Sequence, residues 1–202
     1  MTKLNLLEKM KKVMIFKMMA TVILLLMVTI SCEKEPSNGN GKGNGNGNSG
    51  NSAKIIAQGN CGSDGDNLKW ILTKDSLLTI TGNGAMQSYG SGVAAPWYEY
   101  QDYINTCVVK KGVTSIGSVA FFNCYNMNSV TIPNSVTSIS MFAFWLCSGL
   151  TSITNQNPIP IEINEYVFLQ MDRSACTLKV PAGSVSAYKN ANVWKDFKVV
   201  SM

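Results

Sequence analysis

The chain has no histidine among its 202 residues. Histidine provides most acid–base chemistry near neutral pH, activates serine and cysteine nucleophiles, and is the commonest zinc ligand. Its absence excludes the catalytic classes that depend on it. A zinc site made of thiolates alone is also disfavoured, because none of the six cysteines stands in a Cys-x-x-Cys spacing. We therefore predict no metal site and no cofactor.

Acidic residues are sparse as well, with 12 in the whole chain. A glycosidase, which needs no histidine, still needs a pair of carboxylates. None of the acids lies in residues 112–157, where the sequence repeats itself; those after residue 53 are scattered through the flanking segments, as Asp64, Asp66, Asp75, Glu99, Asp102, Glu162, Glu165, Asp172 and Asp196. We expect solvated surface charges, and predict that the protein has no catalytic residues and is not an enzyme.

Basic residues are concentrated at the start of the chain. Of the 17 lysines and arginines, five precede Cys32, where the only acid is Glu8; the remainder has 12 basic and 11 acidic residues. The net charge of +5 therefore belongs mainly to the leader. A nucleic-acid-binding domain needs a clustered basic face, so no nucleic-acid partner is predicted.

Residues 1–31 have the three parts of a secretory signal peptide: a lysine-rich start, an apolar run from Met18 to Ile30, and Ser31 before Cys32. The run is shorter than the roughly 20 residues of a membrane-spanning helix, although snorkelling of Lys17 leaves a permanent anchor as an alternative. Residues 28–32 resemble the lipobox of bacterial lipoproteins, except that Thr29 replaces a Leu-like residue. The resemblance implies a diacylated Cys32 and a membrane contact through that lipid. Translation from Met1 or Met10 leaves the same mature chain.

Residues 32–52 are predicted to be a lipid-anchored tether. Glu33 and Glu35 follow the cysteine, and such acids resemble the signal that carries some lipoproteins to the outer face of the outer membrane. Ser37–Ser52 consists almost entirely of Gly, Asn and Ser, a composition that buries nothing and remains flexible. We expect a lipid-anchored outer-membrane protein facing the cell surface, with a periplasmic orientation as the alternative.

A repeat of 23 residues aligns Gly112–Asn134 with Ser135–Asn157. A fixed period with spaced aliphatic residues is typical of a solenoid, in which each turn buries its apolar side chains against the next. The alternating run Ser129–Ile132 and its counterpart from Ser152 predict strands that stack in parallel. The matching pairs are Val113 with Val136, Ile116 with Ile139, Ala120–Phe121 with Ala143–Phe144, Cys124 with Cys147, Met127 with Leu150, and Val130 with Ile153.

The run SVTIPNSVTSI, together with the Ala-Phe pairs and the cysteines at these spacings, resembles the BspA-type leucine-rich repeats of bacterial surface proteins. The resemblance implies a mainly β protein: a short leucine-rich-repeat β-solenoid closed by a cap at each end. We assign residues 53–103 to a β-rich N-terminal cap, in which 68–72 and 78–80 form a hairpin, and 104–157 to the repeats. Residues 158–202 are assigned to a degenerate repeat, with Tyr166-Val167-Phe168 near the place of an Ala-Phe pair, and a C-terminal cap with a short helix.

The cysteines after Cys32 stand in a compartment where disulfides form. Cys124 and Cys147 occupy equivalent places in successive repeats, and Cys107 aligns with core positions, so we expect buried free thiols. A disulfide, if present, would involve Cys61 or Cys176.

Two sets of residues are candidates for ligand binding. Phe122 and Trp145 follow the buried Ala-Phe pairs and would form an exposed aromatic patch suited to a protein or a sugar; the alternative is that they only cover the turn. A small polar face is formed by Thr106, Ser129, Thr131, Ser152 and Thr154, which any solvent-facing strand could also carry.

The resemblance implies a surface-exposed, non-catalytic adhesion or binding module whose partner is an extracellular or host protein, or a glycan. The alternative function is a cell-envelope accessory lipoprotein that docks another surface protein, for example in glycan capture.

Overall fold

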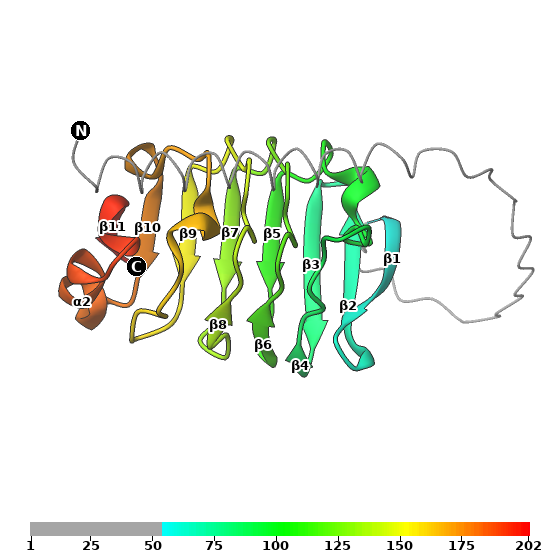
Figure 1. Ribbon diagram of the computed structural model, residues 1–202, viewed down its shortest axis with the longest axis horizontal. Coiled ribbons are helices and arrows are strands. Elements are labelled where there is room, and N and C mark those ends of the chain that lie inside the picture. Colours follow the sequence, from blue (N-terminus) through cyan, green and yellow to red (C-terminus); the bar gives the residue numbers. More distant parts are fainter. Residues whose placement is uncertain (1–53) are drawn as a thin grey trace, which may run out of the picture. The chain divides into compact units, whose positions relative to one another are not determined.

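The computed structural model describes residues 54–202 (Figure 1). The predicted signal peptide, Cys32 and the tether lie outside the described residues. The turn at Gly90–Val93 belongs to one unit, and its two end residues exchange backbone hydrogen bonds of 2.7 and 3.0 Å. The other unit holds every helix and strand named below.

Two sheets build this second unit. The larger has eight strands, in the order β1 (Ile55–Gly62), β2 (Gly65–Thr73), β3 (Leu77–Gly82), β5 (Thr106–Val109), β7 (Ser129–Ile132), β9 (Ser152–Asn155), β10 (Thr177–Val180) and β11 (Lys198–Ser201). The smaller has three strands, β4 (Gly84–Ala85), β6 (Val113–Ile116) and β8 (Ser138–Ile139). Short helices connect them: α2 (Val185–Asn190) and the 3-10 turns η1 (Tyr98–Tyr100), η2 (Glu165–Phe168), η3 (Arg173–Ala175), η4 (Ala182–Ser184) and η5 (Trp194–Asp196).

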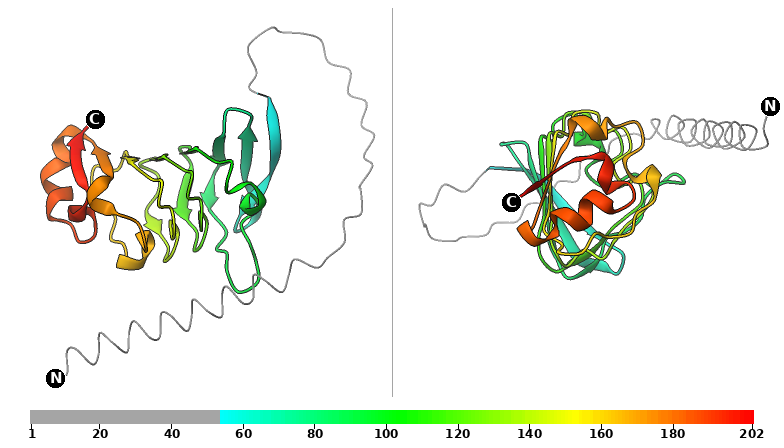
Figure 2. Two further views of the ribbon diagram at one scale, coloured as in Figure 1. Left: turned by 90° about the horizontal axis from the view of Figure 1, so that it is seen from above. Right: turned by 90° about the vertical axis from the view of Figure 1, so that its left-hand side faces the viewer.

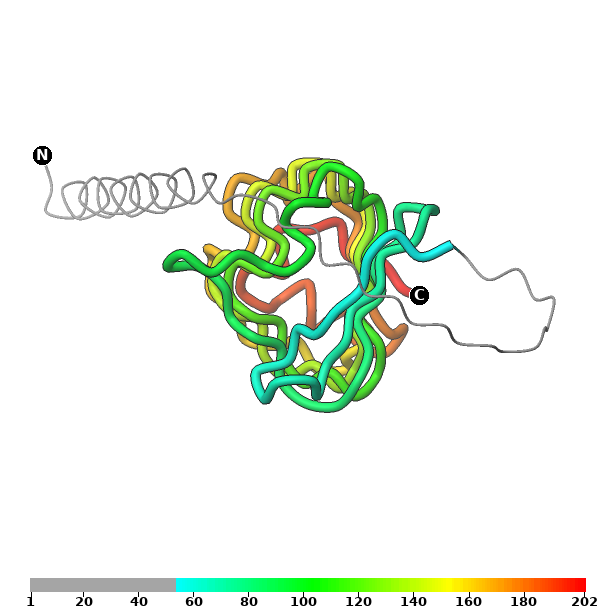
Figure 3. The backbone as a smooth tube through the Cα atoms, turned by 90° about the vertical axis from the view of Figure 1, so that its right-hand side faces the viewer, coloured from blue at the N-terminus to red at the C-terminus, as the bar shows by residue number. Residues whose placement is uncertain are grey.

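The pairing in the large sheet changes from antiparallel to parallel at β3. The predicted hairpin is confirmed, since β2 and β3 pair antiparallel with Trp70 opposite Ile80. From β3 onward every pairing in the large sheet is parallel. The repeat period sets the register, because Thr106, Ser129 and Ser152 are successive partners. The predicted stacked strands are therefore confirmed, and in Figure 3 the successive turns of this unit superpose.

A stack of aromatic rings runs through the core. The ring centroids of Trp97 and Phe121 are 5.6 Å apart, those of Phe121 and Phe144 5.1 Å, and those of Phe144 and Phe168 5.2 Å, with interplanar angles of 21°, 12° and 9°. These four side chains are at most 1% exposed. Offset stacking adds about 0.5–1.5 kcal/mol per pair beyond area burial. Phe168 continues the stack, as expected for a degenerate third copy.

The turns that carry these rings adopt a left-handed backbone at corresponding positions. Asn123, Leu146 and Gln170 have φ of 59°, 62° and 59°. The conformation costs of order 1–3 kcal/mol for a residue with a side chain. Hydrogen bonds between turns offset that cost: the Asn123 N–H donates to the Trp145 carbonyl at 2.9 Å, and the Leu146 N–H to the Leu169 carbonyl at 3.1 Å. Stacking of the turns thus stabilises a backbone that each turn alone would disfavour.

The C-terminal cap, which includes α2 and β11, covers one end of the sheets (Figure 2). Its aromatic side chains close the stack and are buried. Phe168 meets Trp194 and Phe197 edge-on, at 5.8 and 5.1 Å. Trp194 Nε1 donates to the Ile161 carbonyl at 2.7 Å, so burial leaves that donor satisfied. The helix α2 confirms the predicted short helix of this cap.

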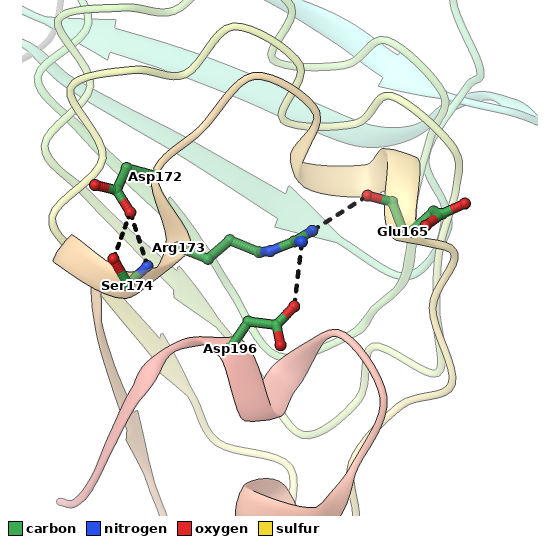
Figure 4. Close-up of polar contacts among 5 residues, drawn as sticks. All are labelled: Glu165, Asp172, Arg173, Ser174 and Asp196. Atoms are coloured by element: carbon green, nitrogen blue, oxygen red, sulfur yellow. Dashed lines mark hydrogen bonds and ion pairs between the residues drawn. The ribbon is translucent and has the colours of Figure 1, made fainter. Parts of the chain in front are cut away.

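A polar clasp on the same cap ties η2, η3 and η5 together (Figure 4). Arg173 pairs with the Asp196 carboxylate at 3.1 Å and donates to the Glu165 carbonyl at 3.4 Å. Asp172 accepts from the Ser174 N–H and hydroxyl at 3.0 and 2.7 Å. These bonds to the ionised carboxylate lower the pKa of Asp172.

Removing one ring of the stack should destabilise the whole unit. We expect Phe144→Ala to lower the free energy of unfolding by about 3–5 kcal/mol, because it leaves a cavity between Phe121 and Phe168. Met141→Ala, at a side chain 40% exposed, should change it by less than about 0.5 kcal/mol. Urea denaturation of both variants checks this, and equal small losses would show that the stack is not the main support.

Candidate functional site

The outer face of the large sheet brings together the predicted polar residues. Side chains alternate along each strand, and the inward set is buried, with Cys107, Val130 and Ile153 at most 1% exposed. The residues between them therefore point outward and are half-buried. We call the following set the hydroxyl face: Thr106, Ser129, Thr131, Ser152, Thr154 and Thr177.

Register makes the hydroxyl face continuous. Thr106, Ser129, Ser152 and Thr177 are successive partners in one row, and Thr131 pairs with Thr154 in the next. The Ser129 hydroxyl donates to the Thr106 hydroxyl at 3.3 Å. Adjacent strands lie about 4.8 Å apart, so hydroxyl groups recur at that spacing.

Lysines flank the hydroxyl face, and sequence reasoning missed them. Lys179 is the register partner of Thr154, and Lys198 that of Thr177. Lys69 lies on β2 opposite Thr81. All three side chains are exposed. The TLKV pattern of β10 matches the alternation of β7 and β9, a signal that could have found Thr177 and Lys179.

A hollow opens on the same sheet, over β1 to β3. Its volume is about 370 Å³, and it is lined by Gln58, Gly59, Asn60, Lys69, Trp70, Ile71 and Thr81. Lys69 lies between Asn60 and Thr81 in the strand register. The hollow therefore offers an ammonium, two side-chain amides and a hydroxyl.

The predicted exposed aromatic patch is wrong. Phe122 and Trp145 are 8% and 3% exposed. Their ring centroids lie 4.6 Å apart, and two further rings cover them: Tyr98 stacks on Phe122 at 6.3 Å and Phe142 packs against Trp145 at 5.6 Å. Tyr98 lies outside the two aligned repeats, and Phe142 aligns with Val119. The alignment of the repeats therefore did not predict the burial. The pair covers the turn, as the alternative interpretation held.

Two tyrosines that the sequence reasoning did not select are exposed instead. Tyr103 and Tyr125, 39% and 41% exposed, lie in the loops that enter β5 and β7. The Tyr103 hydroxyl donates to the Lys74 carbonyl. The Asp102 carboxylate hydrogen-bonds the Tyr125 hydroxyl and raises its pKa. These contacts restrain two exposed aromatic rings in the loops before β5 and β7.

The five cysteines of residues 54–202 are free and buried. The prediction of free thiols at Cys107, Cys124 and Cys147 is confirmed, and Cys61 and Cys176 form no disulfide. Burial raises the pKa of Cys124 to about 12. The Cys147 thiol donates to the Phe121 carbonyl at 3.0 Å. Thiols held neutral in this way are structural, and the described part of the chain contains no metal-binding cluster of Cys, Asp or Glu.

Among residues 54–202 there is also no helix with the length and hydrophobicity needed to span a bilayer.

The thiols should make stability fall in alkali. An unfolded thiol titrates near pH 8.5, so between that pH and about 12 the native state binds more protons than the unfolded state. Full stability is thus present below about pH 8.5 and is lost as the pH rises. Between pH 8 and 10.5, the free energy of unfolding should fall by about 2 kcal/mol less in Cys124→Ala than in the parent chain.

The control for that measurement is Ile116→Val, a core change without a titrating group, which should follow the parent curve. Identical pH curves for Cys124→Ala and the parent chain would contradict a buried neutral thiol.

Residues 95–191 match the family described as BspA type leucine rich repeat region (6 copies), a range wider than the 104–157 expected for the repeats. The crystal structure of a leucine-rich repeat protein from Eubacterium ventriosum has 28% sequence identity and a TM-score of 0.45, over 63% of this chain and 38% of that one. No curated protein matches. Residues 95–191 are therefore a region of BspA-type leucine-rich repeats.

Proposed function

We propose that the protein is a surface-exposed lipoprotein that acts as a non-catalytic binding module, with the hydroxyl face as its contact surface. The observation that carries this proposal is the continuity of that face. Six outward hydroxyls on four neighbouring parallel strands lie in register. Each of these six side chains is partly exposed in the described part of the chain. BspA-type repeats are generally surface and protein-binding modules, which supports this assignment.

The proposal includes a β-solenoid. Each repeat supplies one strand to the large sheet and one to the small sheet, and both sheets keep the 23-residue register. Such a stack buries its apolar side chains between turns and presents one repeated outer surface. A flat surface of that kind suits an extended partner, either an extracellular or host protein or a glycan.

The lipid anchor at Cys32 and the surface orientation complete the proposal. A chain tethered by residues 32–52 would hold the binding unit a few nanometres from the bilayer, since a flexible linker spans about 5–6 Å times the square root of its length. Protease added to whole cells tests the orientation. Digestion of the binding unit supports the surface, and protection until the outer membrane is opened supports a periplasmic orientation.

A second candidate is the accessory lipoprotein that docks another envelope protein. The exposed Tyr103 and Tyr125 favour it, because tyrosine is enriched among the residues that dominate protein interfaces. Loss of a co-purifying envelope protein on Tyr103→Ala, Tyr125→Ala, with binding through the hydroxyl face unaffected, would support docking at this site.

Bulk added to the hydroxyl face should abolish binding. The test is a screen of the full chain, purified in detergent, against a panel of matrix proteins and a glycan array. We expect Thr131→Gln, Thr154→Gln to lose at least tenfold in affinity for the ligand found, because longer side chains occupy the contact surface.

The matched control is Thr114→Gln, Thr137→Gln. These threonines are exposed, have the same 23-residue spacing and lie outside the large sheet, so their substitution should change affinity less than twofold. Equal losses in the two double variants, or none in either, would place the binding surface elsewhere.

A further inference from the structure

The charge on the outer face of the large sheet has one sign. Among the strand residues that alternate outward from the buried ones, the ionisable side chains are Lys69, Lys179 and Lys198, and no acid stands among them. Lys110 follows β5 directly. The only ion pair within residues 54–202 joins Arg173 to Asp196, so these four ammonium groups are uncompensated.

One lysine lines the hollow and another follows the next strand. Lys69 faces Thr81 across the β2–β3 pairing. The Lys110 N–H donates to the Ile80 carbonyl at 2.9 Å, the bond that ends the β3–β5 ladder at the Ile80–Val109 pair, so Lys110 and Thr81 each come directly after that pair. Lys69 and Lys110 thus stand two strands apart, about 10 Å, with the Thr81 hydroxyl between them. An anionic group placed there would meet ammonium groups on both sides.

The chemistry of the rest of the face favours a sugar over a peptide. Its outward rows have no Trp, Tyr or Arg, the residues that dominate protein interfaces, and consist largely of Ser and Thr, which are under-represented there. Hydroxyl side chains both donate and accept, and can therefore match the hydroxyls of a sugar in either direction. Lys179 and Lys198 extend the positive charge to the last two strands, which lie about 24 and 29 Å from β2 in the strand order.

We propose that the outer face of the large sheet binds an extended acidic polysaccharide, with one carboxylate or sulfate held between Lys69 and Lys110. The inference rests on the proposed function and narrows it to one class of partner. The chain would run across the strands over the hydroxyl face toward Lys179.

The test measures binding of the full chain, purified in detergent, to polygalacturonate, dextran sulfate, neutral dextran and poly-L-aspartate. We expect binding to one or both acidic polysaccharides, weakened by salt, and none to dextran. The two acidic polysaccharides distinguish a carboxylate from a sulfate. Lys69→Gln, Lys110→Gln should lose at least tenfold in affinity.

The matched control is Lys189→Gln, Lys195→Gln. It removes the same charge from exposed lysines of α2 and η5 and should change affinity less than twofold. Both double variants replace exposed side chains and should retain the parent unfolding temperature, which is measured alongside.

Four results would overturn the inference. These are no binding to either acidic polysaccharide, parent affinity in Lys69→Gln, Lys110→Gln, an equal loss in the control, or equally tight binding of poly-L-aspartate that the same lysine variant abolishes. If a neutral glycan or a protein binds instead and Thr131→Gln, Thr154→Gln removes it, the inference fails while the proposed function stands.

Discussion

Stacking of aromatic rings from successive turns is the interaction on which the rest of this structure depends. Phe121 and Phe144 lie in the same place in adjacent repeats, 5.1 Å apart and nearly parallel. Trp97 and Phe168 extend the stack into the two caps. Aromatic rings pack at centroid separations of about 4.5–7 Å, which accommodates the spacing of about 4.8 Å between neighbouring strands. The stack therefore supports the same register as the backbone hydrogen bonds of the two sheets.

The outer surface follows from that register. Once each turn repeats the one before, outward residues of neighbouring strands must form rows, and the side chain at one position recurs about 4.8 Å away. Ser and Thr at these positions give a row of hydroxyls that the core does not need. The structure thus separates its tasks: buried aromatics hold the turns, and the side chains between them are free to contact a partner.

The sequence predicted those features that the 23-residue period controls. Alternation together with the period located the strand Ser129–Ile132 at its observed bounds and the stacked Ala-Phe pairs. It did not reveal the burial of Phe122, because Tyr98 covers it from outside the two aligned repeats.

The lysines were missed for similar reasons. Lys179 lies 25 residues after Thr154, its partner on β9. The 23-residue period therefore does not align the two positions. Lys69 lies on an antiparallel strand of the cap, and only the pairing of β2 with β3 brings it to the same face. Period and composition locate what repeats, whereas contacts across caps require the folded chain.

The most direct test of this account is a lysine acetylation footprint of the full chain, read by mass spectrometry with and without polygalacturonate. The account predicts that the polymer protects Lys69, Lys110 and Lys179 and leaves Lys189 and Lys195 as reactive as before. Protection of Lys189 and Lys195, with the sheet lysines unchanged, would contradict it, because the contact surface would then lie on the C-terminal cap.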